Sequence, residues 1–267
     1  MSKCKRKPRA THYSNSNQFD TETFQPRNRK EASLAAKKPN VVNFNTYVRE
    51  KRKVDITPKT QNQAEYVGYL RDWEKSAVFA LGPAGSGKTL LAVLAGIQAL
   101  KDGDVKKIII ARPAVEVEGE KHGFLPGTLT EKLAPWAIPV MDVFKEYYSV
   151  PEIAGLLEEE IVELASLGMM RGRTFKDAWI ILDEAQNVSP TQLLMFLTRI
   201  GDNSKMVITG DLKQTDRSFQ KDNSGLLDFF KRFDGHKSDA IVKVEFDKGD
   251  IQRHPLVTEI LTLYEKD

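Results

Sequence analysis

The sequence predicts an α/β fold in which helices flank a parallel sheet. Short apolar segments rich in β-branched residues alternate with segments of helical periodicity along most of the chain. The apolar segments are continuous in hydrophobicity, which is typical of parallel strands covered on both faces. A glycine-rich turn joins the first of these segments to a long helical one. Together these observations favour one sheet in one main domain.

Individual elements can be assigned from the local patterns. Strands are expected at residues 77–81, 107–112, 179–183, 205–209 and 241–246, with an edge strand near 161–164. Residues 54–60 are expected to be extended. Helices are expected at residues 63–73, 89–100, 190–200, 224–233 and 255–265. Ser189, Pro190 and Gln192 form a capping-box pattern at the start of the 190–200 helix, and Gly201 follows its end.

The connection between the second and third main strands is long. It contains a second capping-box pattern, from Thr128 to Glu131, followed by an apolar-periodic run towards Tyr147. A loop of this length without secondary structure would be unusual in a compact domain. We therefore expect a helical insertion.

Composition limits the class of protein. The chain has 267 residues, of which 40% are hydrophobic, enough for one large core. It contains no apolar run of the roughly 20 residues that a membrane span needs, and no secretory signal pattern. Cys4 is the single cysteine, and the four histidines lack metal-ligand spacing. These features favour a cytoplasmic protein without a disulfide framework.

Positive charge is concentrated near the N-terminus. The first 55 residues carry 14 of the 40 basic residues but only 5 of the 37 acidic ones. This stretch is also polar and lacks apolar periodicity, so residues 1–53 are expected to form a disordered basic arm before a domain at 54–267. Such an arm can contact a phosphate backbone, but its composition fits a solvated tail equally well.

The glycine-rich turn has the pattern G-x-x-x-x-G-K-[ST] between a strand and a helix, which is the context that phosphate binding requires. Its backbone N–H groups and the helix N-terminus would face phosphate oxygens. Lys88 would reach the β- and γ-phosphates, and the Thr89 hydroxyl would bind Mg²⁺. The expected ATP-binding residues of the turn are Gly82, Pro83, Ala84, Gly85, Ser86, Gly87, Lys88 and Thr89.

Two adjacent acids, Asp183 and Glu184, follow the apolar strand at 179–183. Asp183 would hold Mg²⁺ together with Thr89, and Glu184 would orient or deprotonate the attacking water. An acid pair after a strand is often only a strand end or a helix cap. After a phosphate-binding turn, it predicts ATP hydrolysis.

Further polar residues could complete a hydrolytic site. Gln214 follows the strand at 205–209, where it could detect the γ-phosphate, although a plain polar loop is the alternative. One more cation is expected for charge that develops in the transition state. The candidates for this role are Arg112, Arg171, Arg173, Arg199 and Arg253. Arg253 is the first choice and Arg199 the second, while each arginine taken singly is also compatible with a surface salt bridge.

With these residues in hand, the chain resembles the PhoH family of ATPases, which are similar to the RecA-like nucleotide-binding core of superfamily-one helicases. The resemblance covers roughly residues 59–264. Its motifs are GPAGSGKT from Gly82, ARPAV from Ala111, GFLPG from Gly123, MRGRT from Met170, ILDEAQN from Ile181, FLTRIG from Phe196, VITGD from Val207 and RHPLV from Arg253.

The resemblance implies residue roles that the patterns alone do not. It places Gln63 in an adenine-recognition element, and it places Arg112, Arg171 and Arg173 where a helicase-like core meets nucleic acid. It further implies an ATPase linked to RNA, with helicase activity described for some relatives fused to a nuclease domain. Outside the expected ATP site, the acidic residues of this sequence form no recognisable cluster of the kind that a nuclease uses.

These observations favour an ATP- and Mg²⁺-dependent ATPase coupled to single-stranded RNA or DNA. Because only one core is expected, a neighbouring copy would complete each ATP site, in a ring with a hexamer favoured. The alternative is a slow ATP-dependent switch or assembly protein that acts on a protein partner.

Overall fold

The computed structural model describes residues 53–113, 129–212, 224–252 and 256. They all belong to one compact unit, Glu50–Asp267. Within them lies a six-stranded sheet whose order is β3-β2-β4-β5-β1-β6 and whose pairings are all parallel. The strands are β1 (Ala77–Leu81), β2 (Lys107–Arg112), β3 (Val162–Ser166), β4 (Ala178–Leu182), β5 (Lys205–Gly210) and β6 (Ile241–Glu245).

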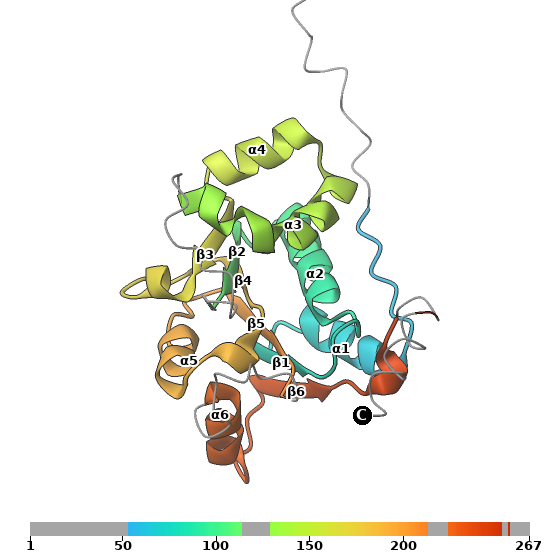
Figure 1. The fold of residues 1–267 in the computed structure, drawn as a ribbon, viewed down its shortest axis with the longest axis vertical. Coiled ribbons are helices and arrows are strands. Elements are labelled where there is room, and N and C mark those ends of the chain that lie inside the picture. Colours follow the sequence, from blue (N-terminus) through green and yellow to red (C-terminus); the bar gives the residue numbers. More distant parts are fainter. Residues whose placement is uncertain (1–52, 114–128, 213–223, 253–255, 257–267) are drawn as a thin grey trace, which may run out of the picture. The chain divides into compact units, whose positions relative to one another are not determined.

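Helices cover both faces of this sheet (Figure 1). One face carries the first four helices and the other carries α5 and α6, as the two groups of packed residues show. The helices are α1 (Gln61–Arg71), α2 (Lys88–Asp102), α3 (Leu129–Tyr147), α4 (Val150–Glu158), α5 (Pro190–Leu197) and α6 (Gly225–Phe233). The predicted α/β class, parallel sheet and helical insertion are therefore confirmed.

Successive residues of each central strand point to opposite cores. In β1, Val78 and Ala80 pack towards α1 and α2, whereas Phe79 and Leu81 pack towards α5 and α6. All four are buried. Because neither face meets water, the strand sequences are continuous in hydrophobicity, which is the pattern that predicted them.

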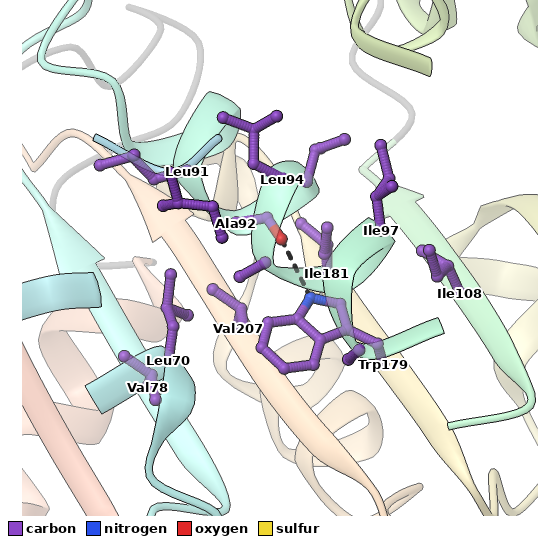
Figure 2. Packing of buried hydrophobic residues seen from close by; sticks show 14 of the residues in the cluster. Leu70, Val78, Leu91, Ala92, Leu94, Ile97, Ile108, Trp179, Ile181 and Val207 are labelled. Carbon is purple, nitrogen blue, oxygen red and sulfur yellow. Dashed lines mark hydrogen bonds between the residues drawn. The ribbon is translucent and has the colours of Figure 1, made fainter. Parts of the chain in front are cut away.

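Trp179 fixes α2 against the sheet (Figure 2). Its indole Nε1 donates a hydrogen bond to the Ala92 carbonyl oxygen at 3.1 Å. The ring passes so close to Gly96 that a Cβ there would lie 2.7 Å from the indole Cδ1. This glycine is therefore required in a helix interior where alanine would otherwise be preferred.

Lys205 is a fully buried lysine at the start of β5. Its Nζ donates to the carbonyl oxygens of Tyr69, Leu70 and Asp72 at 2.7–2.8 Å, so it satisfies the C-terminal end of α1. Burial lowers the pKa of its ammonium to about 8, which the charge of Asp72 partly opposes. The lysine thus links α1 to the centre of the sheet.

Element boundaries differ from the predictions by a few residues. The strands at 77–81 and 107–112 match, and the predicted cap of α5 forms with Ser189 and Gln192. The 190–200 helix ends earlier, at Leu197, because the chain then turns to pair Ile200 with Phe175. Gly201 consequently donates to the Phe175 carbonyl rather than capping the helix.

Other predictions differ in the same way or cannot be compared. The 63–73 helix begins at Gln61, because the Thr60 side chain caps it. The Thr128 cap, the basic arm apart from Lys53 and the 255–265 helix apart from Leu256 lie outside the described ranges. In the part of the chain that is described, no helix is both long and apolar enough to cross a membrane.

Candidate functional site

A cavity of about 260 Å³ opens at the carboxyl edge of the sheet. It is lined by the turn after β1, by the acid pair after β4 and by Gly210 and Asp211 at the end of β5. Parallel strands bring these segments together because their carboxyl ends share one edge. β5 lies between β1 and β4, so it separates the turn from the acid pair.

The turn after β1 needs its glycines. Gly82, Gly85 and Gly87 have φ values of 145°, 86° and 85°, which other residues rarely adopt. At Gly82 a Cβ would also lie 2.4 Å from the Phe246 carbonyl oxygen. α2 begins at Lys88 with no side-chain cap bond from Gly87. This arrangement leaves the amino end of α2 directed at the cavity, as a phosphate site requires.

The Lys88 ammonium lies within the turn. Its Nζ donates to the carbonyl oxygens of Gly82 and Pro83, each at 2.7 Å, and to Ser86 Oγ at 3.1 Å. Burial lowers the pKa of Lys88, while the negative charges of Asp211, Asp183 and Glu184 act in the opposite direction. The lysine is therefore held at the cavity wall by neutral acceptors that a charged phosphate can replace.

Asp183 receives hydrogen bonds from two neighbouring elements. The Thr89 hydroxyl, on α2, donates to its Oδ1 at 2.8 Å, and the Thr209 hydroxyl, on β5, donates to the same oxygen at 2.6 Å. The two residues predicted to hold Mg²⁺ thus lie within hydrogen-bond distance of each other. Thr209 is an additional partner that the sequence analysis did not single out.

Glu184 has an unusual backbone and two side-chain partners. Its φ is 55°, in the left-handed region, which turns the chain sharply after β4. The Gln186 amide Nε2 donates to Oε2, and the Arg112 guanidinium lies 3.4 Å from Oε1. Gln186 Oε1 accepts a bond from the Asp211 N–H at 3.0 Å, so it connects the ends of β4 and β5.

Gln63 is buried against the back of the glycine-rich turn. Its Nε2 donates to the Ser86 carbonyl oxygen at 3.0 Å, and its Oε1 accepts from the Lys59 N–H at 2.7 Å. Only 4% of this residue is exposed. Both ends of the Gln63 side-chain amide thus bond to backbone groups of the protein, and one of these groups belongs to the glycine-rich turn.

Two of the predicted arginines lie away from the cavity. Arg173 forms a bidentate ion pair with Glu163 and stacks over the Phe175 ring at 4.6 Å. Arg199 donates to the carbonyl oxygens of Met195 and Arg173. Arg173 lies in the segment that leads into β4, and the Arg199 carbonyl oxygen accepts from the Phe175 N–H of the same segment at 2.9 Å. The start of β4 is at the edge of the sheet opposite the cavity.

The remaining predicted residues are exposed or not described. Arg171 is exposed after a short 3-10 helix at Leu167–Met170. Gln214 and Arg253 lie outside the described ranges. Gln252, one residue before Arg253, donates its N–H to the Gly85 carbonyl oxygen at 3.0 Å. Of the predicted catalytic and metal-binding residues, Lys88, Thr89, Asp183 and Glu184 are the ones that lie together at the cavity described above.

Sequence reasoning missed Thr209, Gln186 and the position of Arg112 in this site. Thr209 and Arg112 stand at the carboxyl ends of strands that flank β4, so the edge rule that located Asp183 could have located them. Gln186 lies two residues after Glu184 and carried no pattern of its own.

The donor set at Asp183 fits magnesium. A carboxylate and a hydroxyl, both oxygen ligands, lie 2.8 Å apart at the cavity wall. No group of three or more His, Cys, Asp or Glu side chains suited to a metal occurs among the described residues. Mg²⁺ does not require one, because it takes one or two protein oxygens and completes its shell with substrate phosphates and water.

The fold and this site have the architecture of a P-loop nucleotide-binding protein. The chain belongs to the PhoH family, because the family model described as PhoH-like protein matches residues 55–265.

Several curated relatives are similar to this chain. The PhoH-like protein of Bacillus subtilis (strain 168) is 47% identical over 211 residues, which cover 79% of this chain and 64% of the relative. The protein PhoH of Escherichia coli (strain K12) is 39% identical, covering 79% of this chain and 59% of that protein. This chain therefore spans about three fifths of the length of these relatives.

Among solved structures, the large terminase of a thermophilic bacteriophage has a TM-score of 0.48 and 9% sequence identity. The match covers 77% of this chain and 50% of the terminase chain.

We expect Thr209→Val to weaken metal binding, because valine keeps the shape of the side chain but cannot orient Asp183. The Mg²⁺ concentration that half-saturates ATP binding should rise about 10-fold, as for loss of other groups that orient a metal ligand. Titration with a fluorescent ATP analogue would measure it. Thr57→Val, which removes an exposed threonine–carboxylate bond to Asp55, is the matched control. An unchanged Mg²⁺ dependence would refute this role of Thr209.

Proposed function

We propose that the chain binds ATP with Mg²⁺ and hydrolyses it, and that hydrolysis is coupled to single-stranded nucleic acid. The observation that supports hydrolysis most strongly is Glu184 at the cavity, immediately after the Asp183 carboxylate that accepts a bond from Thr89. A protein that only binds nucleotide has no need of a second carboxylate beside the metal ligand.

Each residue of the site would have a separate role in phosphoryl transfer. The N–H groups of the turn and of α2 hold the phosphate oxygens, and Lys88 exchanges its carbonyl partners for the β- and γ-phosphates. Magnesium, held by Thr89 with Asp183, would neutralise charge on these phosphates. Glu184 accepts a proton from the attacking water and orients it in line with the γ-phosphate.

Two further roles are proposals for residues whose contacts differ from the expectation or are not described. Gln63 would read the adenine edge if its amide exchanged one of its two protein bonds for the base. Gln214 would detect the γ-phosphate. Both follow from the family resemblance together with their positions in the sequence.

We expect Glu184→Gln to bind ATP with near-normal affinity and to hydrolyse it about 100-fold to 10,000-fold more slowly, because an amide cannot accept the proton. Steady-state phosphate release and binding of a fluorescent ATP analogue would measure the two effects. Glu163→Gln, which affects a carboxylate paired with Arg173, is a control for carboxylate removal away from the cavity. Equal turnover of the wild type and Glu184→Gln would refute hydrolysis at this site.

Coupling to nucleic acid is supported by the basic character of the first 55 residues and by exposed Arg171. We expect single-stranded RNA to raise the ATPase rate several-fold and to bind with an affinity that falls steeply as salt increases. Phosphate release would be measured with and without a poly-uridine strand at two salt concentrations. No stimulation and no salt-sensitive binding of RNA or single-stranded DNA would remove this half of the proposal.

We also propose that neighbouring copies complete each ATP site in a ring, with a hexamer favoured. The described cavity contains no arginine among its lining residues, and Arg199 lies at the opposite edge of the sheet. Arg199 of one copy, or Arg253, could therefore supply the missing cation to the next. We expect a hexameric mass by size-exclusion chromatography with light scattering in the presence of ATP. A fully active monomer would contradict this arrangement.

The alternative is a slow switch that binds ATP, changes shape for a protein partner and turns over little. It is favoured if wild-type turnover matches that of Glu184→Gln while ATP binding is retained. Whether ATP hydrolysis also drives unwinding of a duplex would be tested by a strand-separation assay once RNA-stimulated turnover is established.

A further inference from the structure

Arg112 stands beside the proposed catalytic carboxylate. It is the last residue of β2, and its guanidinium Nη2 lies 3.4 Å from Glu184 Oε1. The resemblance had placed this arginine at a nucleic-acid surface. Its side chain is instead only one-third exposed, and it contacts the residue that the proposed mechanism uses as its base.

The backbone holds this pair in register. β2 and β4 are parallel neighbours in which Ala111 lies opposite Leu182. The ladder continues one step beyond β4, because the Asp183 N–H donates to the Ala111 carbonyl oxygen at 2.9 Å. Arg112 and Glu184 are therefore carried by adjacent backbone segments that hydrogen bonds keep at a fixed spacing.

The Glu184 carboxylate is held from two sides. Arg112 lies against Oε1, and Gln186, two residues after Glu184, donates to Oε2. Among the described residues, Arg112 is the only cation in ion-pair contact with Glu184. The other charged groups of the cavity are Asp183, Asp211 and Lys88, so this arginine balances part of a local excess of negative charge.

The pair contributes little to stability, because both side chains are about one-third exposed and solvent screens the attraction between them. Its geometric effect is larger. A guanidinium in ion-pair contact with one oxygen and an amide hydrogen-bonded to the other restrict rotation of the carboxylate, so the attacking water meets it in a narrow range of orientations. Misplacement of a reacting group by about 1 Å can lower a rate about 100-fold.

We propose that Arg112 is a positioning residue for Glu184 and sets the orientation in which this carboxylate accepts the proton of the attacking water. The proposal rests on the proposed function, since it assigns a task within ATP hydrolysis. Arg112 does not line the cavity and is not bonded to the glycine-rich turn, so its contribution falls on turnover rather than on ATP binding.

The test compares Arg112→Met, Arg112→Gln and Arg112→Lys with the wild-type chain. We expect the first two to lower kcat about 10-fold to 100-fold, with the affinity for ATP changed by less than about twofold. Arg112→Lys should recover part of kcat, because it restores a cation at the end of β2 but not the planar fork. Arg232→Met, which removes an exposed arginine paired with Asp228 on α6, is the matched control.

A second measurement separates positioning from a general structural effect. In a Glu184→Gln background, Arg112→Met should cause almost no further loss, because the group on which it acts is already disabled. A structural role would produce the same loss in both backgrounds. Thermal unfolding of each variant would show that the folded state is retained, and Arg112→Gln replaces Arg112→Met if the latter unfolds.

The outcomes distinguish this inference from the function on which it rests. If the wild type hydrolyses ATP and Arg112→Met retains its kcat, or if the two substitutions are additive, the positioning role is overturned. If the wild type hydrolyses no faster than Glu184→Gln, the proposed function fails and the positioning role fails with it. A lowered kcat with unchanged affinity, partial rescue by lysine and non-additivity together support it.

Discussion

The geometry of the site depends on the Asp183 carboxylate, whose Oδ1 accepts hydrogen bonds from Thr89 and Thr209. These three residues belong to the start of α2, the end of β4 and the end of β5. Because β5 lies between β1 and β4, Thr209 can reach the acid only if the strands keep this order. The two hydrogen bonds to Asp183 Oδ1 therefore form together only when the turn after β1 and the acid pair after β4 are correctly placed.

Packing on both faces of the sheet maintains this arrangement. Trp179, in the strand that immediately precedes Asp183, fixes α2 through its bond to Ala92 and its contact with Gly96. Lys205, in the same strand as Thr209, ties α1 to the sheet through three carbonyl groups. The strands that present the site at one end are thus anchored to helices at the other. Local mutations in these contacts would move the site as a unit.

The sequence predicted the parts of this structure that follow from periodicity and short motifs. The strands at 77–81 and 107–112 and the cap at Ser189 depend on neighbouring residues in the chain. The grouping of Lys88 and Thr89 with Asp183 and Glu184 follows from two short motifs and from the rule that the carboxyl ends of parallel strands share one edge. The strand order, the bond from Thr209 and the approach of Arg112 to Glu184 depend on contacts between distant segments. The edge rule can place Thr209 and Arg112 at the same edge as Asp183, but without the strand order it does not say which side chains meet. Arg112 therefore remained one of five candidate cations and, by resemblance, a nucleic-acid contact.

The proposed chemistry requires that the cavity at the carboxyl edge of the sheet binds ATP together with Mg²⁺. A crystal structure with magnesium and a non-hydrolysable ATP analogue is the decisive experiment. We expect phosphates within the turn Gly82–Thr89, Lys88 bonded to them, and a metal beside Thr89 and Asp183. Glu184 should face the γ-phosphate while still paired with Arg112. Nucleotide bound elsewhere, or a metal held without Thr89 and Asp183, would show that this cavity is not the Mg²⁺–ATP site.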